Sequence, residues 1–274
     1  VELDNIYKLL DYPEQEKDHN ITLIPGKNIV LSNVSFSYNE DPTLKDINMI
    51  FKPNTKTALV GESGSGKSTI IKLILGLNSN YAGSIKYDTF DIDTIPTNEM
   101  SKIATLITND SYLVQGSIRS HLSVNKHITE EDMYNALEKV NLKDFVVENG
   151  GLDFELSCGA GNLSGGQKQR LLAAKAILKD SYIYILDEAV SNIDDYSKKI
   201  VLDAFDSIKD GKIIVVISHD LETITNSDNI YVLKDQKIIE EGTHEQLIDQ
   251  PSLYKKLFND QQQLKEKFLA KEVE

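Results

Sequence analysis

The sequence predicts an α/β fold in which helices pack against buried parallel strands. Tyr182–Leu186 and Ile213–Ile217 are short apolar runs rich in β-branched residues, and each ends at a polar cluster, as is typical of buried parallel strands. A third apolar stretch, Ala58–Val60, leads into a glycine-rich loop, and a Ser/Thr-started apolar run, Thr69–Leu75, follows it. The chain therefore contains a strand, a loop and a helix in the order that α/β proteins use to bind phosphate.

The glycine-rich segment, Gly61–Ser68, fits the phosphate-binding pattern G-x-x-x-x-G-K-S/T at every fixed position. Its glycines let backbone N–H groups turn toward phosphate oxygens, and the helix start adds a positive dipole. Lys67 adds a point charge, and Ser68 offers a hydroxyl to Mg²⁺. The predicted nucleotide-binding residues of this phosphate loop are Gly61, Glu62, Ser63, Gly64, Ser65, Gly66, Lys67, Ser68 and Thr69.

The composition is that of a globular protein, with 274 residues and 40% hydrophobic content. The net charge of -14 repels nucleic-acid backbones, and no basic patch is visible, so we expect no nucleic-acid partner. Cys158 is the only cysteine, which excludes an intrachain disulfide and favours a reducing compartment. No apolar run approaches the ~20 residues that span a bilayer, so we expect this chain itself to be soluble.

The order of the remaining segments predicts a β-rich front and a helical insertion. Glu2–Leu10 has helical spacing and precedes a charged linker. The expected front strands are Ile29–Leu31, Val34–Tyr38 and Ile47–Phe51, and the expected later helices are Glu130–Phe145 and Gln167–Leu178. Gln261–Ala270 is helical and charged without a clear apolar face, so we expect a frayed or partner-dependent tail.

Two carboxylates follow the strand Tyr182–Leu186 directly. Asp187 and Glu188 would lie at the carboxyl end of a buried strand, where α/β sheets gather their ligands. Phosphoryl transfer needs a metal that neutralises phosphate charge and a second group that orients the attacking water. We therefore assign Asp187 to Mg²⁺ and Glu188 to the water.

A second anion site is predicted at Leu163–Gln167, which reads Leu-Ser-Gly-Gly-Gln and directly precedes a helix that we expect to begin near Lys168. A serine, glycine amides and the helix dipole together favour a phosphate. Two such elements either surround one nucleotide within the chain or serve a neighbouring subunit, and the residues alone do not choose between these arrangements.

With these motifs, the chain resembles the nucleotide-binding domain of an ATP-binding cassette (ABC) transporter, whose signature is Leu-Ser-Gly-Gly-Gln. The resemblance implies a P-loop NTPase (RecA-like) core with an antiparallel β subdomain and an inserted helical subdomain. It implies ATP and Mg²⁺ as ligands. It also implies a dimer in which the signature of one subunit closes over the ATP of the other, formed here by Leu163, Ser164, Gly165, Gly166 and Gln167.

The resemblance assigns roles to three further residues. Tyr38, in Phe-Ser-Tyr, matches the aromatic residue that stacks on adenine. His219 follows the strand Ile213–Ile217 and matches the switch histidine that contacts the terminal phosphate, which makes it catalytic beside Glu188. Asp194, in Ser-Asn-Ile-Asp, matches the loop that crosses the dimer interface, where the family usually has Ser-Ala-Leu-Asp.

Two positions depart from the family pattern. The glutamine that contacts magnesium and couples to the membrane domain falls on Asn109, a shorter amide, and a different alignment would place Thr108 or Gln115 there. Cys158 stands where exporter relatives commonly carry an acidic residue that touches the partner's coupling helices. The details of coupling to a membrane domain are therefore open.

The flanks of the chain favour an exporter. Residues 1–24 resemble a connection from an upstream membrane domain, and 241–247 resemble the exporter-type ending. We expect a nucleotide-binding domain over 25–250, with its helical insertion at about 110–178, and a helical tail over 251–274. The resemblance implies an ATP-hydrolysing motor domain, in a homodimer, on the cytoplasmic face of the cell membrane.

Two alternatives remain at this stage. A soluble ABC ATPase acting on translation or chromosomes would carry a second cassette, a long coiled coil or basic surfaces, and the chain shows none of these. A peripheral ATPase subunit of an importer would begin close to Val1, and both the missing initiator methionine and the flanks count against it.

Overall fold

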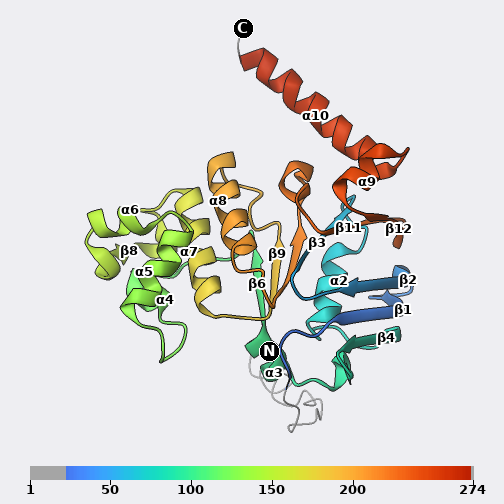
Figure 1. Cartoon of the computed structure of the whole chain (residues 1–274), viewed down its shortest axis with the longest axis horizontal. Coiled ribbons are helices and arrows are strands. Elements are labelled where there is room, and N and C mark those ends of the chain that lie inside the picture. The colour runs from blue at the N-terminus through green and yellow to red at the C-terminus, as the bar shows by residue number, and fades with distance from the viewer. Residues whose placement is uncertain (1–22, 273–274) are drawn as a thin grey trace, which may run out of the picture.

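The computed structural model describes residues 23–272, and the side chains of this range as far as residue 267. The expected helix Glu2–Leu10 and most of the linker after it lie outside the described residues. The described residues form a six-stranded sheet, a four-stranded sheet and a two-stranded sheet, with a group of helices on one side of the six-stranded sheet (Figure 1).

The larger sheet has six strands in the order β12-β11-β3-β10-β9-β6. Only the β11–β12 pair is antiparallel, and the other neighbours are parallel. The strands, in sheet order, are β12 (Lys237–Gly242), β11 (Asn229–Lys234), β3 (Thr55–Gly61), β10 (Ile213–Ile217), β9 (Ile183–Asp187) and β6 (Ala104–Thr108). The predicted α/β class is confirmed, because the apolar runs form the central strands of this sheet.

A second, antiparallel sheet of four strands stands beside the first (Figure 1). Its strands, in sheet order, are β2 (Pro42–Phe51), β1 (Ile29–Ser37), β4 (Ala82–Tyr87) and β5 (Phe90–Asp91). The two front strands expected at Ile29–Leu31 and Val34–Tyr38 are one strand with an irregularity between them. Asn33 takes a positive φ of 51° there, and its N–H donates to Asn48 Oδ1 at 2.9 Å, so the chain bends without ending the strand.

The helical group follows β6 and lies apart from the antiparallel sheet (Figure 1). It contains α4 (Ile118–Leu122), α5 (Glu130–Lys139), α6 (Lys143–Glu148) and α7 (Gly165–Leu178), with short strands β7 (Gly116–Ser117) and β8 (Glu155–Leu156). The single helix expected over Glu130–Phe145 is wrong, because Asn141 has a φ of 48° and breaks it into α5 and α6.

The remaining helices border the sheets. They are α2 (Lys67–Ile74), α3 (Thr97–Ile103), α8 (Asp195–Asp206), α9 (His244–Asp249) and α10 (Leu253–Glu272), with 3₁₀ turns η1 (Ile92–Thr94), η2 (Gly151–Asp153), η3 (Cys158–Ala160) and η4 (Leu221–Ile224). Helix α10 extends away from the body toward the C-terminus (Figure 1). Across residues 23–272, no helix combines the length and apolar content needed to cross a membrane.

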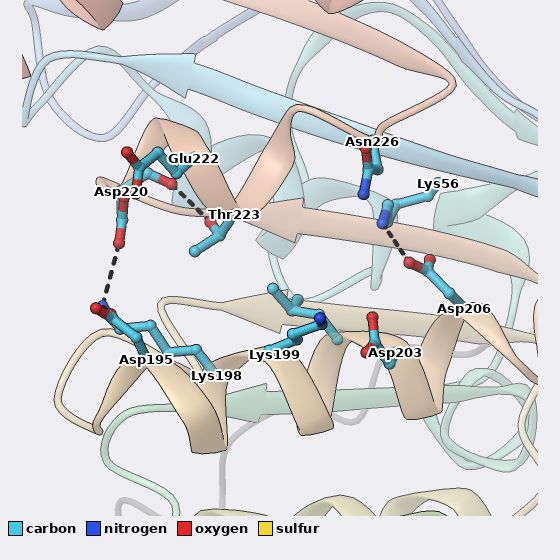
Figure 2. A pocket seen from close by; sticks show the side chains of 11 residues that line it. Lys56, Asp195, Lys198, Lys199, Asp203, Asp206, Asp220, Glu222, Thr223 and Asn226 are labelled. Atoms are coloured by element: carbon cyan, nitrogen blue, oxygen red, sulfur yellow. Dashed lines mark hydrogen bonds and ion pairs between the residues drawn. The ribbon is translucent and has the colours of Figure 1, made fainter. Parts of the chain in front are cut away.

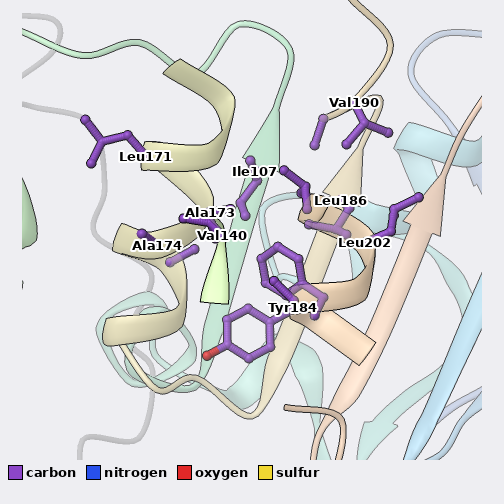
Figure 3. Close-up of a cluster of buried hydrophobic side chains, with 14 of the residues drawn as sticks. Ile107, Val140, Leu171, Ala173, Ala174, Tyr184, Leu186, Val190 and Leu202 are labelled. Atoms are coloured by element: carbon purple, nitrogen blue, oxygen red, sulfur yellow. The ribbon is translucent and has the colours of Figure 1, made fainter. Parts of the chain in front are cut away.

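Two hydrophobic cores lie on opposite faces of the larger sheet. Alternate residues of β9 show the division, since Tyr184 and Leu186 belong to one core and Ile183 and Ile185 to the other. Figure 3 shows the first core, where Tyr184 and Leu186 lie between helix α7 and helix α8. The sheet is therefore buried on both faces, and the polar residues at its strand ends are held on a rigid frame.

Candidate nucleotide site at the ends of the central strands

The phosphate loop connects β3 to α2 through backbone conformations that favour glycine. Gly66 is the N-cap of α2 with a φ of 104°, and a Cβ there would lie 2.4 Å from Leu44 Cδ2. A Cβ on Gly61 would lie 2.4 Å from the carbonyl oxygen of Leu233. Side chains at these two positions would displace neighbouring atoms, so the sequence needs glycine here for the loop to close against the sheet.

Lys67 is buried at the centre of this loop, with 6% of its surface exposed. Its Nζ donates to the carbonyl oxygens of Gly61 at 2.8 Å and Glu62 at 2.9 Å. Burial lowers the pKa of the Lys67 ammonium, while the charges of Glu188 and Asp187 act in the opposite direction. When a nucleotide binds, the Lys67 ammonium can exchange these carbonyl oxygens for phosphate oxygens as its hydrogen-bond acceptors.

A cavity of about 200 Å³ opens in front of the loop. It brings together residues from four distant parts of the sequence: Thr43 from β2, the loop and the start of α2, Glu188 after β9, and His219 after β10. The loop residues that line it are Ser63, Gly64, Gly66, Lys67, Ser68 and Thr69. Six of the nine predicted phosphate-loop residues and both predicted catalytic residues therefore line one cavity, whereas Gly61, Glu62 and Ser65 do not.

Asp187 and Ser68 form the candidate magnesium pair. The Ser68 side chain is hydrogen-bonded to the Asp187 carboxylate. Burial raises the pKa of Asp187, and the Glu188 charge adds to this, whereas Ser68 and the charges of Lys67 and His219 oppose it. A hydroxyl beside a carboxylate is the oxygen donor set that Mg²⁺ uses with phosphate groups, so these residues fit the ion.

Glu188 has a backbone conformation that is uncommon outside glycine, with a φ of 54°. Its N–H donates to Ile217 O at 2.9 Å, and its carbonyl accepts from both Ser191 N–H at 3.1 Å and Ser191 Oγ at 2.9 Å. These bonds hold a residue whose conformation costs free energy, a feature that is concentrated at active sites.

His219 reaches Glu188 from the neighbouring strand. Its Nε2 lies 2.8 Å from Glu188 Oε1, within hydrogen-bonding distance. The register of the sheet produces this contact, because Ile217 on β10 pairs with Asp187 on β9 and both strands end at the same edge. Two residues assigned separately from the sequence thus lie in contact.

Tyr38 lies beside the start of α2, with 51% of its surface exposed. Its hydroxyl accepts a hydrogen bond from Asn78 Nδ2 at 2.9 Å, and Lys72 Nζ lies 5.8 Å from the ring centre. Partial burial would raise the pKa of the phenol, but hydrogen bonds from Thr69 and Asn78 and the Lys72 charge outweigh it and lower the pKa. An exposed ring held in this way can receive a flat base.

The segment Leu163–Gln167 does not line the cavity of the phosphate loop. The helix expected near Lys168 begins earlier, at Gly165, because Ser164 and Gln167 form a capping box. Ser164 Oγ accepts from Gln167 N–H at 3.1 Å, and Ser164 N–H donates to Gln167 Oε1 at 2.8 Å. Within one chain, the two predicted anion sites are therefore separate.

Asp194 caps the next helix. Its Oδ1 accepts from Ser197 N–H at 2.9 Å at the start of α8, and this backbone bond, followed by the Ser197 hydroxyl, lowers the pKa of the exposed carboxyl. A Cβ on Gly166 would lie 2.8 Å from Asp194 Oδ2 and 2.3 Å from Ser197 Oγ. The glycine thus allows the starts of α7 and α8 to pack closely.

Asn109 lies directly after β6, whose last residue, Thr108, pairs with Asp187. It lines a cavity of about 170 Å³ together with Glu188, Gln169 and Gly165. This places Asn109 next to the predicted catalytic carboxylate. Gln115, the alternative position, precedes β7 and does not line this cavity.

Two residues at the site were not predicted. Thr43 lines the phosphate cavity from β2, and Gln169 donates from its side-chain amide to the carbonyl of Ala189, next to Glu188. Neither belongs to a motif read from the sequence, although Gln169 lies in the helix that starts within Leu-Ser-Gly-Gly-Gln and comes two residues after that string. Contacts between distant segments depend on the fold, so a local pattern does not reveal them.

Comparisons with known proteins confirm the resemblance. A family model described as ABC transporter matches residues 44–191. The chain is 37% identical over 96% of its length to an uncharacterized ABC transporter ATP-binding protein of Haemophilus influenzae, covering 48% of that protein. It is 35% identical over 94% of its length to an ATP-dependent lipid A-core flippase of Saccharophagus degradans, covering 45% of that protein.

Among solved structures, a bacterial Atm1-family ABC exporter with ATP bound superposes with a TM-score of 0.86 at 25% identity. The match covers 94% of this chain and 46% of that one. The chain spans about half the length of the curated relatives it matches.

Proposed function

The chain belongs to the ABC transporter family, and from this membership we propose that it is the ATP-hydrolysing motor domain of an exporter. The observation that carries the proposal is the cavity in which the phosphate loop faces Glu188 and His219. The loop supplies the cradle for the phosphates, and the contacting pair supplies a group for the water and a group for the terminal phosphate.

The chemistry follows from the positions of these side chains. Lys67 and the amides of the loop bind the phosphates, and Tyr38 holds the base. Glu188 orients a water molecule and accepts its proton as the water oxygen attacks the terminal phosphorus, and the bond to the ADP oxygen breaks. His219 contacts the terminal phosphate and, through Nε2, keeps the Glu188 carboxylate in place. Ser68 and Asp187 would hold Mg²⁺, which neutralises charge on the phosphates when bound.

We further propose that the site is completed by a second copy of the chain. The signature segment, Leu163–Gln167, stands outside the chain's own phosphate cavity, which leaves its helix start available to the nucleotide of a partner. An antiparallel pairing of two copies would form two such composite sites by symmetry, with Asp194 close to the shared interface.

A Glu188→Gln variant tests the catalytic assignment. We expect ATP turnover to fall at least ~100-fold, because an amide accepts no proton, while ATP binding persists and holds two copies together. ATPase assays and size measurements with and without ATP check both effects, and Glu131→Gln, an exposed site on α5, is the matched control. Unchanged hydrolysis in Glu188→Gln would remove the assignment.

The partner that couples ATP to export would be a membrane domain, fused or associated, on the cytoplasmic face of the membrane. A groove of about 320 Å³ beside Asn109 supports this proposal. Tyr112, 80% exposed, and Leu106, 40% exposed, line it together with Leu172. Large exposed apolar side chains around a groove are typical of a protein contact.

The native polypeptide tests this part of the proposal directly. An antibody against the chain should detect, in the membrane fraction of the source cells, a protein about twice this length, since about six spanning helices of ~20 residues need that room. A product of the chain's own size in the soluble fraction would contradict fusion and export together.

A further inference from the structure

The C-terminal helix α10 is bonded to the loop that carries His219. This switch loop, Ser218–Glu222, follows β10 and includes the first two residues of η4. The sequence favours a frayed or partner-dependent tail over Gln261–Ala270, but the structure anchors the helix to the switch loop through Gln261, Gln262 and Lys265.

Gln261 holds the backbone of the switch loop at two points. Its Nε2 donates to the carbonyl of His219 at 2.6 Å, and its Oε1 accepts from Leu221 N–H at 3.0 Å. The Gln261 side-chain amide thus bonds to the backbone on both sides of Asp220, with its NH₂ group as donor and its oxygen as acceptor. A neighbouring β-strand would bond to the loop backbone in the same way. Backbone atoms on both sides of Asp220 are fixed, which restricts the φ and ψ angles that aim the His219 side chain.

Charged groups reinforce the same attachment. Lys265 Nζ lies 3.2 Å from Asp220 Oδ1 and also pairs with Glu222. From the other side, Lys198 on α8 reaches Asp220 Oδ2 at 3.1 Å, as Figure 2 shows. Asp220 is partly buried between two lysines from different helices, so the loop is held between α8 and α10.

The loop also bonds to itself. Ser218 Oγ accepts from Asp220 N–H at 3.0 Å. Thr223 Oγ1 donates to the Asp220 carbonyl at 2.6 Å (Figure 2). These bonds keep the turn compact, but they do not fix its direction relative to Glu188. The bonds from Gln261 do so, together with the ion pairs from Asp220 to Lys265 and Lys198, because they connect the turn to helices α10 and α8.

We propose that Gln261, supported by Lys265, is a positioning residue for ATP hydrolysis that aims His219 at Glu188 and the terminal phosphate. The helix α10 is then part of the catalytic apparatus, although none of its residues lines the phosphate cavity in the described structure. The inference rests on the proposed ATPase function. It adds a residue about 40 positions after His219 that no nucleotide-binding motif contains.

The test replaces Gln261 in the full protein that carries this chain. Gln261→Met keeps the length of the side chain and removes both hydrogen bonds, while Gln261→Glu keeps the acceptor for Leu221 N–H and loses the donor. Gln263→Ala, an exposed position on the same helix, is the matched control. We expect kcat to fall about tenfold in Gln261→Met, since two weak bonds orient a group needed in the transition state. The KM for ATP and the melting temperature should stay within experimental error.

Two further measurements distinguish positioning of His219 by Gln261 from a general contribution of Gln261 to the stability of the fold. In a His219→Ala background, Gln261→Met should cause no additional loss of kcat, because its effect passes through His219. In the protein without nucleotide, amide hydrogen exchange of the segment 217–224 should accelerate in Gln261→Met and remain unchanged in Gln263→Ala.

The outcomes are distinguishable. If the wild-type protein hydrolyses ATP and Glu188→Gln does not, but Gln261→Met keeps kcat within twofold, the inference is overturned and the proposed function stands. An equal additional loss in the His219→Ala background would also overturn it. A wild-type protein without ATPase activity would overturn the proposed function and this inference together.

Discussion

The chain contains two helix starts suited to phosphate, and they differ in what surrounds them. The start of α2 has a buried lysine, the Glu188 carboxylate and a histidine around one cavity. The start of α7 lies outside that cavity, satisfies its own N–H groups through the Ser164–Gln167 capping box, and lines a separate cavity with Glu188 through Gly165. This difference supports our proposal that the first region binds and turns over the nucleotide and that the second closes over the nucleotide of a partner.

The largest expected effect concerns the lysine that distinguishes the first region. In Lys67→Ala we expect ATP affinity to fall about 100-fold, because hydrogen bonds to a charged group contribute roughly 1.5–3 kcal/mol each. Titration with a fluorescent ATP analogue measures it, and Lys86→Ala, an exposed lysine on β4, is the control. Affinity within twofold of wild type would show that the loop amides suffice without the lysine.

The next prediction separates nucleotide binding at the phosphate loop from closure of the signature segment over the nucleotide. Ser164→Ala removes the capping box of α7, and Thr129→Ala removes the equivalent box of α5. Each should lower the free energy of unfolding by about 1 kcal/mol. Only Ser164→Ala should also lower ATP turnover, by about tenfold or more, because a partner's phosphates lose a ligand.

Thermal unfolding and ATPase assays on both variants separate these effects. The ATP affinity of a single copy should be unchanged in each variant, because neither residue lines that copy's own phosphate cavity. If Thr129→Ala lost as much turnover as Ser164→Ala, loss of helix stability would explain the result and the signature role would be withdrawn.

The smallest expected effect is on ATP binding and comes from Tyr38, which lies near the start of α2. Tyr38→Ala should weaken ATP binding roughly fivefold, because stacking contributes about 1 kcal/mol. Tyr38→Phe keeps the ring, loses only the hydrogen bonds of the hydroxyl, such as that from Asn78, and should bind within twofold of wild type. An equal loss in both variants would assign the contribution to the hydroxyl rather than to stacking.

Prediction from the sequence succeeded where a local pattern determines the structure. The apolar runs around Leu59, Ile185 and Val215 became central strands, because continuous β-branched segments have no solvated face and must be buried on both sides. The strand ends then placed the assigned Glu188 and His219 within 2.8 Å of each other.

It failed where one residue or a distant contact decides the outcome. Asn33 bends β1 without ending it, and Asn141 breaks a helix, because asparagine tolerates positive φ and hydropathy patterns do not register it. Gln261 begins the segment Gln261–Ala270, which has no clear apolar face, and its proposed role depends on bonds to a loop about 40 residues away in the sequence. Such contacts are invisible to periodicity.

The central claim is that the phosphate loop of one copy meets the signature segment of another, and disulfide cross-linking tests it most directly. The chain has a single cysteine, so Cys158→Ser provides a clean background. Ser63→Cys and Gly165→Cys are suited to the two sides, since a Cβ on Gly165 would meet no atom closer than 3.9 Å. The two variants would be co-expressed with different tags, each also carrying Glu188→Gln.

The measurement is the yield of disulfide-linked dimer that carries both tags after mild oxidation. The account predicts that this heterodimer forms with ATP and is absent without it, because closure over the nucleotide brings the two positions together. A yield that ATP does not change, or no heterodimer at all, would contradict the composite site.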